Sequence, residues 1–146
     1  DRIAEDIPDS ERAELLEALR DRLTGWPVYR GSAGSALAYG SGVVVDISPA
    51  APLGDLARAV REVLRAVRGE AAGTYRQPKA HLSLAYAHST ADSDPWQSKL
   101  RKVDPNHAVI ELAEVHLVDV RVEVRPDSET PTFTWESLGA QIRLTG

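Results

Sequence analysis

Residues 42–69 read GVVVDISPAAPLGDLARAVREVLRAVRG, and this stretch decides the fold. It opens with a short apolar run at residues 43–47, which Pro49 closes, a pattern typical of a buried strand. A helix is predicted next, because Pro52 is tolerated in a first helical turn and Gly69 is a common residue just after a last one. The helix has one apolar face at helical spacing, made of Leu53, Leu56, Val60, Val63, Leu64 and Val67.

The residues before this stretch predict one more helix and one weaker element. Leucines at helical spacing indicate a helix over residues 10–23, capped by Ser10 or Asp9. Residues 26–38 alternate loosely and contain two glycines, so they are predicted as a weak edge strand or an extended segment.

The residues after it are mostly strand patterns. The expected elements are a strand at 80–86, a short helix at 94–103, strands at 108–112, 115–124 and 133–144, the last bent at Gly139. We expect Trp96, Phe133 and Trp135 to lie in the core. The order of elements predicts an α+β fold with largely antiparallel sheets and two main helices.

Composition excludes several classes of function. With 146 residues, the chain suits a single domain over residues 1–146. The absence of cysteine excludes a disulfide scaffold, a zinc–thiolate site and a cysteine nucleophile. A net charge of −5 argues against tight non-specific binding of long nucleic acid, but it leaves a small nucleotide substrate open. No apolar run approaches the ~20 residues of a membrane span.

The N-terminus is unusual because the sequence contains no methionine and begins with Asp1. A translated chain begins with Met, and Asp is too bulky a second residue for general removal of that Met. We therefore expect the chain to be a piece of a longer protein.

His81-Leu82-Ser83 is the stretch that can carry chemistry. Residues two apart in a strand share a face, so His81 and Ser83 should point one way while Leu82, Leu84 and Tyr86 point the other. An imidazole exchanges protons near neutral pH, and a hydroxyl can bind a phosphoryl oxygen. Acid–base catalysis on a phosphodiester is therefore possible without a metal. A purely structural His81 is the competing interpretation.

Residues 78–86, PKAHLSLAY, resemble the second signature motif of the 2H phosphoesterase superfamily, the 2′-5′ RNA ligase-like proteins. Members carry a proline shortly before His-x-[Ser/Thr] on a strand. The resemblance extends over about residues 40–144, through the patterns at 42–47, 52–69, 115–118 and 133–135. Only His81-x-Ser83 is a functional motif.

The resemblance implies two lobes with a cleft between them, into which two His-x-[Ser/Thr] motifs face. One histidine would activate water or a hydroxyl, the other would protonate the leaving oxygen, and the hydroxyls would hold the phosphate. The implied substrates are 2′,3′-cyclic phosphates and 2′-5′ linkages at nucleotide or RNA ends, with no cofactor and no metal. In this chain His81 and Ser83 are the catalytic candidates. Arg76, Lys79 and Tyr86 are the substrate-binding candidates, although Arg76 and Lys79 are equally interpreted as surface charges.

The sequence departs from the family because a second motif is missing. His88 precedes Thr90 by two residues, but it lies only seven residues after His81, and no histidine precedes His81. We expect the first motif upstream, so that this chain holds the C-terminal lobe and part of the first. The alternatives are a degenerate member that binds a nucleotide or RNA end without turnover, and a plain interaction domain. A monomer in the cytoplasm, away from membranes, is the default expectation.

The remaining candidates have plainer interpretations. His116 is expected to pack in the core and His107 to face solvent at a turn. The four histidines show no metal-binding spacing. Four arginines recur on the helix after Pro52, at positions 58, 61, 65 and 68. They could follow a phosphate backbone, but acidic residues lie between them, and a solvated face is the favoured interpretation.

Overall fold

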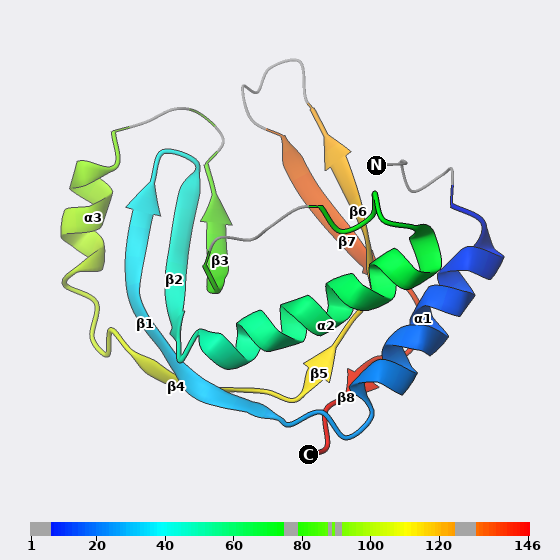
Figure 1. The fold of residues 1–146 in the computed structure, drawn as a ribbon. Coiled ribbons are helices and arrows are strands. Elements are labelled where there is room, and N and C mark those ends of the chain that lie inside the picture. Colours follow the sequence, from blue (N-terminus) through cyan, green and yellow to red (C-terminus); the bar gives the residue numbers. More distant parts are fainter. Residues whose placement is uncertain (1–6, 75–78, 88, 90–91, 125–130) are drawn as a thin grey trace.

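The computed structural model describes residues 7–74, 79–87, 89, 92–124 and 131–146. The fold is α+β, as the order of sequence patterns predicts (Figure 1). In chain order the elements are α1 (Asp9–Leu23), β1 (Tyr29–Tyr39), β2 (Gly42–Ser48), α2 (Ala51–Arg68), β3 (His81–Tyr86), α3 (Asp94–Leu100), β4 (Ala108–Leu112), β5 (Glu114–Val115), β6 (Val118–Glu123), β7 (Thr132–Ser137) and β8 (Ile142–Arg143).

Three antiparallel sheets make up the strand layer. The largest has four strands in the order β3-β2-β1-β4, and the others are the pairs β5–β8 and β6–β7. In Figure 1, β1, β2 and β3 lie side by side, α3 flanks the β1 side, and β6 and β7 stand apart as a long ribbon. Strand β3, which carries the candidate motif, is therefore an edge strand of the main sheet.

Helix α2 forms where the sequence predicts it. It runs from Ala51 to Arg68, with a proline in its first turn. Gly69 ends it with φ of 85°, and the Gly69 N–H donates to the Arg65 carbonyl oxygen at 2.9 Å. Among the described residues no helix is both long and apolar enough to cross a membrane.

Residues 26–38 were predicted as a weak edge strand or an extended segment. Instead, most of them belong to β1, an eleven-residue strand in the interior of the main sheet. Its glycines mark close approaches of neighbouring groups. A Cβ at Gly31 would lie 2.2 Å from the Tyr29 hydroxyl oxygen, and one at Gly34 would lie 2.9 Å from the His107 ring. Glycine is thus needed here because side chains pass directly over the backbone.

Two predicted long strands are each broken into a pair. The pattern at 115–124 forms β5 and β6, and the pattern at 133–144 forms β7 and β8. The breaks lie opposite each other, where the Leu138 N–H donates to the Leu117 carbonyl oxygen at 2.8 Å. Gly139 has φ of 79°, which supplies the expected bend.

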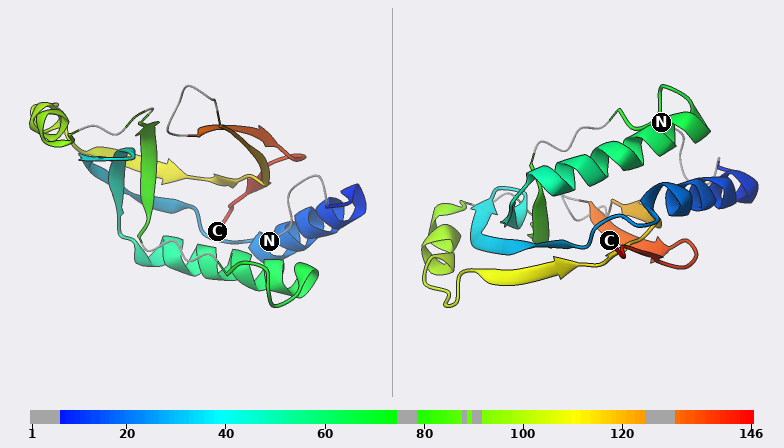
Figure 2. Two further views of the ribbon diagram at one scale, coloured as in Figure 1. Left: turned by 90° about the horizontal axis from the view of Figure 1, so that it is seen from above. Right: turned by 60° about the horizontal axis from the view of Figure 1, so that its bottom comes forward.

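The core is built mainly between α1, α2 and β8. Its buried members are Leu15, Leu19, Leu23, Ala59, Val63, Ile142 and Leu144. An ion pair between Arg68 and Glu11, at 3.1 Å and largely shielded from solvent, also joins the two helices. Both views in Figure 2 show α1 and α2 close together, with β3 near the opposite end of α2. The candidate strand therefore lies away from the best-packed part of the molecule.

Three aromatic residues predicted in the core lie on the surface. Trp96, Phe133 and Trp135 are 55%, 36% and 67% exposed. Phe133 and Trp135 pair with Val122 and Val120 across the β6–β7 ribbon. Both valines are exposed as well, so most of this apolar face is uncovered in the described structure. An apolar period shows that residues share a face, but it does not show that another layer covers that face.

Candidate functional site

Strand β3 holds its two candidate catalytic residues on one face of the main sheet. His81 pairs with Asp46 and Ser83 pairs with Val44 on strand β2. Cross-strand partners lie on the same face, and so do residues two apart, so His81, Ser83 and Asp46 share this side of the sheet. His81 is half-buried and Ser83 is exposed.

The His81 ring is held by the backbone just before it. Its Nδ1 lies 2.9 Å from the Lys79 carbonyl oxygen. A carbonyl can only accept, so in the neutral ring Nδ1 carries the hydrogen and donates it. Nε2 then keeps its lone pair and can take a proton, or give one when the ring is charged. This geometry suits a general acid–base group.

Lys79 is paired with a carboxylate beside His81. Its Nζ donates to Asp46 Oδ2. This hydrogen bond, together with the negative charge of Asp46, raises the pKa of the Lys79 ammonium above its usual value. A phosphate bound by Lys79 would have to compete with Asp46. Arg76, the other predicted cation, lies outside the described residues.

Tyr86 lies on the same face as His81 and Ser83, which corrects the prediction that it points away from them. Ser83 pairs with Val44 and Ala85 pairs with Val43, so two residues of β3 stand opposite one residue of β2. Such a bulge shifts the alternation of side chains by one residue. Strand period alone could not reveal this, because a bulge depends on the pairing with β2.

Tyr86 also brings the β6–β7 ribbon close to β3. Its ring centroid lies 5.2 Å from that of Phe133, with the ring planes tilted by 38°. Phe133 was expected in the core, so its place at the candidate site was missed. In the sequence, residues 133–135 resemble a family pattern. That resemblance did not indicate that Phe133 would lie near β3.

The other histidines lie elsewhere. His107 Nδ1 is 2.7 Å from Asn106 Oδ1, before β4, and His107 is exposed as expected. His116 is exposed, 3.7 Å from Glu114, which corrects its placement in the core. His88 lies outside the described residues. Among the described residues, no three His, Cys, Asp or Glu side chains lie close enough together to bind a metal ion.

A cavity of about 370 Å³ lies beside His81, between β3 and the start of α2. Its lining combines apolar side chains of α2, such as Leu53 and Ala57, with His81, Lys79 and Leu82 of the β3 region. Its charged lining residue, Lys79, is the one already paired with Asp46.

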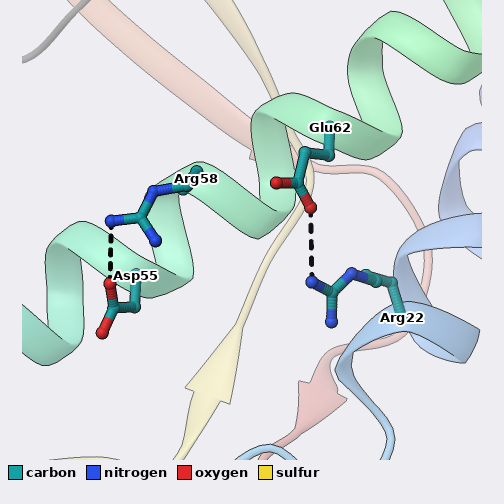
Figure 3. Close-up of polar contacts among 4 residues, drawn as sticks. All are labelled: Arg22, Asp55, Arg58 and Glu62. Atoms are coloured by element: carbon teal, nitrogen blue, oxygen red, sulfur yellow. Dashed lines mark hydrogen bonds and ion pairs between the residues drawn. The ribbon is translucent and has the colours of Figure 1, made fainter.

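Of the four arginines of α2, Arg58 fits the solvated face that was predicted, whereas Arg68 is shielded in its ion pair with Glu11. Arg58 pairs with Asp55 at 2.9 Å, and Glu62 pairs with Arg22 of α1 at 3.3 Å (Figure 3). The four side chains of these two pairs are substantially exposed. Such exposed pairs contribute little to stability.

Comparison with known proteins finds a similar fold. The chain resembles the crystal structure of the protein TT0787 of Thermus thermophilus, with a TM-score of 0.58 and 16% sequence identity. The match covers 95% of this chain and 73% of that protein. At this identity the similarity is one of fold. No model of a protein family matches the sequence, and no curated protein matches it.

Proposed function

We propose that the chain carries a half-site of a 2′-5′ RNA ligase-like phosphoesterase, acting on a 2′,3′-cyclic phosphate or a 2′-5′ linkage at a nucleotide or RNA end. The observation that carries the proposal is the His81 ring, whose Nδ1 is engaged by the Lys79 carbonyl while Nε2 is left for proton transfer. Ser83 stands beside it on the same face. The resemblance of residues 78–86 to the superfamily motif supports the same assignment.

The two residues have distinct roles in the proposed reaction. His81 Nε2 takes a proton from the attacking water as the water oxygen bonds to phosphorus. The bond from phosphorus to one ribose oxygen breaks, and that oxygen takes up a proton from the solvent. The Ser83 hydroxyl donates a hydrogen bond to a non-bridging phosphate oxygen, whose charge makes the bond a strong one. His81 can equally serve the reverse proton transfer, as the acid toward the leaving oxygen.

A second candidate function is nucleotide or RNA-end binding without turnover. It is favoured by the contacts of the described histidines, because His107 lies against Asn106 before β4 and His116 lies near Glu114 of β5, and neither contact places a second imidazole beside His81. A site with one proton-transfer group instead of two should lose about 10²–10⁴-fold in rate. Binding by Ser83 and the face around it would remain.

One assay separates the two functions. The chain is incubated with 2′,3′-cyclic AMP, with and without EDTA, and product is measured alongside calorimetric binding of 2′-AMP. The phosphoesterase proposal predicts turnover that survives EDTA and is lost in His81→Ala, while His116→Ala, an exposed histidine elsewhere, keeps full activity. Binding that Ser83→Ala weakens, without turnover, supports the binding module. No binding and no turnover rejects both.

A further inference from the structure

The main sheet carries its fixed charges in two ion pairs that join neighbouring strands. Arg30 Nε of β1 lies 2.9 Å from Glu111 Oε2 of β4, and Lys79, just before β3, pairs with Asp46 of β2. Over the residues of β1, β2, β3 and β4 and at Lys79, these four are the Lys, Arg, Asp and Glu side chains that occur. Apart from the imidazole of His81, the described sheet therefore presents no net charge to a ligand.

Asp46 lies at the centre of the candidate site. It is the cross-strand partner of His81, and in this register Ser83 is its diagonal neighbour on the same face. Directly paired residues have Cβ atoms about 4.5–5.5 Å apart, and diagonal neighbours are about 7–8 Å apart. A phosphate held between His81 and Ser83 would therefore lie on the order of 7 Å from the Asp46 carboxylate.

Lys79 offers that phosphate a cation that is already in use. Its Nζ donates to Asp46 Oδ2, and this contact raises the pKa of the Lys79 ammonium, so the ammonium stays charged at neutral pH. The Lys79 side chain is 63% exposed and that of Asp46 is 36% exposed, so an incoming anion can reach both. The pair thus presents one attractive and one repulsive charge to the phosphate.

The number of negative charges on the phosphate decides how the pair responds to it. A phosphodiester, cyclic or linear, carries one negative charge. Water that opens the proposed cyclic substrate breaks one bond from phosphorus to a ribose oxygen and leaves a phosphomonoester, whose second proton dissociates with a pKa of about 6. The product therefore carries nearly two negative charges at neutral pH. Two unit charges about 7 Å apart change a binding constant by about threefold, even at the dielectric constant of water.

We propose that Asp46 is a specificity residue of the candidate site: it neutralises Lys79, so that a singly charged phosphodiester is accepted and a doubly charged phosphomonoester is disfavoured. This inference rests on the proposed function for the phosphate and its place beside Ser83. Asp46 takes no part in making or breaking bonds. Its charge repels the second negative charge that the reaction creates, which promotes release of the product.

The first test measures calorimetric binding of three adenosine derivatives at low salt, where screening is weak. Adenosine has no charge, 3′,5′-cyclic AMP has one negative charge, and 2′-AMP has nearly two. Asp46→Asn should leave adenosine binding unchanged, tighten binding of 3′,5′-cyclic AMP about threefold, and tighten binding of 2′-AMP about tenfold. Asp55→Asn is the matched control, because Asp55 is another exposed aspartate in an ion pair, with Arg58 of α2 at 2.9 Å.

Lys79→Met should act in the opposite direction, because it removes the cation that offsets Asp46. We expect weaker binding, with a larger loss for 2′-AMP than for 3′,5′-cyclic AMP. The double variant of Asp46→Asn with Lys79→Met should bind 2′-AMP about as the unmodified chain does. If the pair were merely structural, both single variants would weaken the ligands equally, and that result would overturn the proposal.

The outcomes separate this inference from the proposed function. If the gain in Asp46→Asn grows with ligand charge but His81→Ala leaves cleavage unchanged, the role of Asp46 stands and the phosphoesterase proposal fails. If Asp46→Asn binds the ligands as the unmodified chain does, or no ligand binds, while cleavage still needs His81, the role of Asp46 is rejected and the proposed function stands. A chain that neither binds nor cleaves rejects both.

The second test measures inhibition of 2′,3′-cyclic AMP cleavage by 2′-AMP. Asp46→Asn should lower the inhibition constant of 2′-AMP about tenfold, and it should lower the KM of the cyclic substrate by about threefold at most. An equal change in the two constants would show that Asp46 does not distinguish a phosphodiester from a phosphomonoester, and would overturn its assignment as a specificity residue.

Discussion

His81 takes its tautomer from a backbone oxygen two residues before it, so the geometry of one peptide decides which ring nitrogen faces a substrate. This feature is local in sequence, since Lys79 and His81 lie on the same short segment. The neighbouring Lys79–Asp46 pair joins β2 to the segment just before β3, and pairing between β2 and β3 brings its two residues together. At this scale the sequence predicts the shared face of His81 and Ser83, because a two-residue period is intrinsic to a strand.

If Ser83 binds the phosphate through its hydroxyl, removing that hydroxyl should lower kcat/KM for the proposed reaction. Loss of a hydrogen bond to a charged group costs about 1.5–3 kcal/mol, so Ser83→Ala should lower kcat/KM by about tenfold or more. Ser83→Thr keeps a hydroxyl and should stay within a few-fold of the unmodified chain. Steady-state kinetics on 2′,3′-cyclic AMP give the comparison. Equal losses in both variants would show that the hydroxyl is not what binds the phosphate.

Tyr29 should make the free energy of unfolding depend on pH in the alkaline range. Its ring is buried, and its hydroxyl donates to the Pro49 carbonyl oxygen at 3.1 Å. Burial raises the pKa of Tyr29 above the usual 10.0. The folded state then binds this proton more tightly than the unfolded state, so the free energy of unfolding should fall as pH rises past about 10.

The pKa of Lys79 is also raised, above 10.5, and its effect has the same sign. Denaturant unfolding between pH 9 and pH 11 measures the combined slope. Tyr29→Phe should make the fall in stability shallower, because the titrating phenol is gone. An unchanged slope in Tyr29→Phe, in a variant that still folds, would contradict the role given to the buried hydroxyl.

At the scale of elements, those with strong local signals were predicted correctly. Helix α2 has an apolar stripe and a glycine at its end, and β4 is a short, mainly apolar strand. The central position of β1 was not predictable, because its glycines weaken a strand pattern while in the fold they admit the Tyr29 and His107 side chains. The bulge in β3, which moves Tyr86, depends on its partner strand in the same way.

Two glycines of α2 should respond oppositely to the same substitution. Gly54 lies within the helix, and no atom would lie within 4 Å of a Cβ added there. Gly54→Ala should therefore stabilise the protein by about 0.5–1 kcal/mol. Gly69 has φ of 85° at the helix end, so Gly69→Ala should destabilise it by about 1 kcal/mol. Urea unfolding of both variants tests this, and the same sign of change in both would contradict the helix end described.

At the scale of the whole molecule, packing is uneven. The core joins α1, α2 and β8, whereas β6 and β7 form a two-stranded ribbon whose valines, Phe133 and Trp135 are exposed. The sequence could not show this, because periodicity gives the apolar face of a strand but not the distance to the next layer. Strand β3 carries the candidate site, and its last residue, Tyr86, contacts Phe133 of the ribbon.

This unevenness predicts a gradient of protection from hydrogen exchange. A two-stranded ribbon with one uncovered face is marginally stable, so β6 and β7 amides should exchange faster than those of α1 and α2. Leu19 is 4% exposed in the core, and Leu19→Ala should destabilise the chain by about 2–5 kcal/mol. Hydrogen exchange measured by NMR in the unmodified protein and in Leu19→Ala should show that the helices lose protection in the variant. Greater protection in β6–β7 than in the helices would contradict the described core.

The most direct test of the central claim is single-turnover hydrolysis of 2′,3′-cyclic AMP by the chain and by His81→Ala, at enzyme in excess over substrate. The account predicts a measurable rate that is unchanged by EDTA and falls about 10²–10⁴-fold in His81→Ala, with folding of the variant checked by circular dichroism. Equal rates for the folded variant and the unmodified chain would contradict a catalytic role for His81.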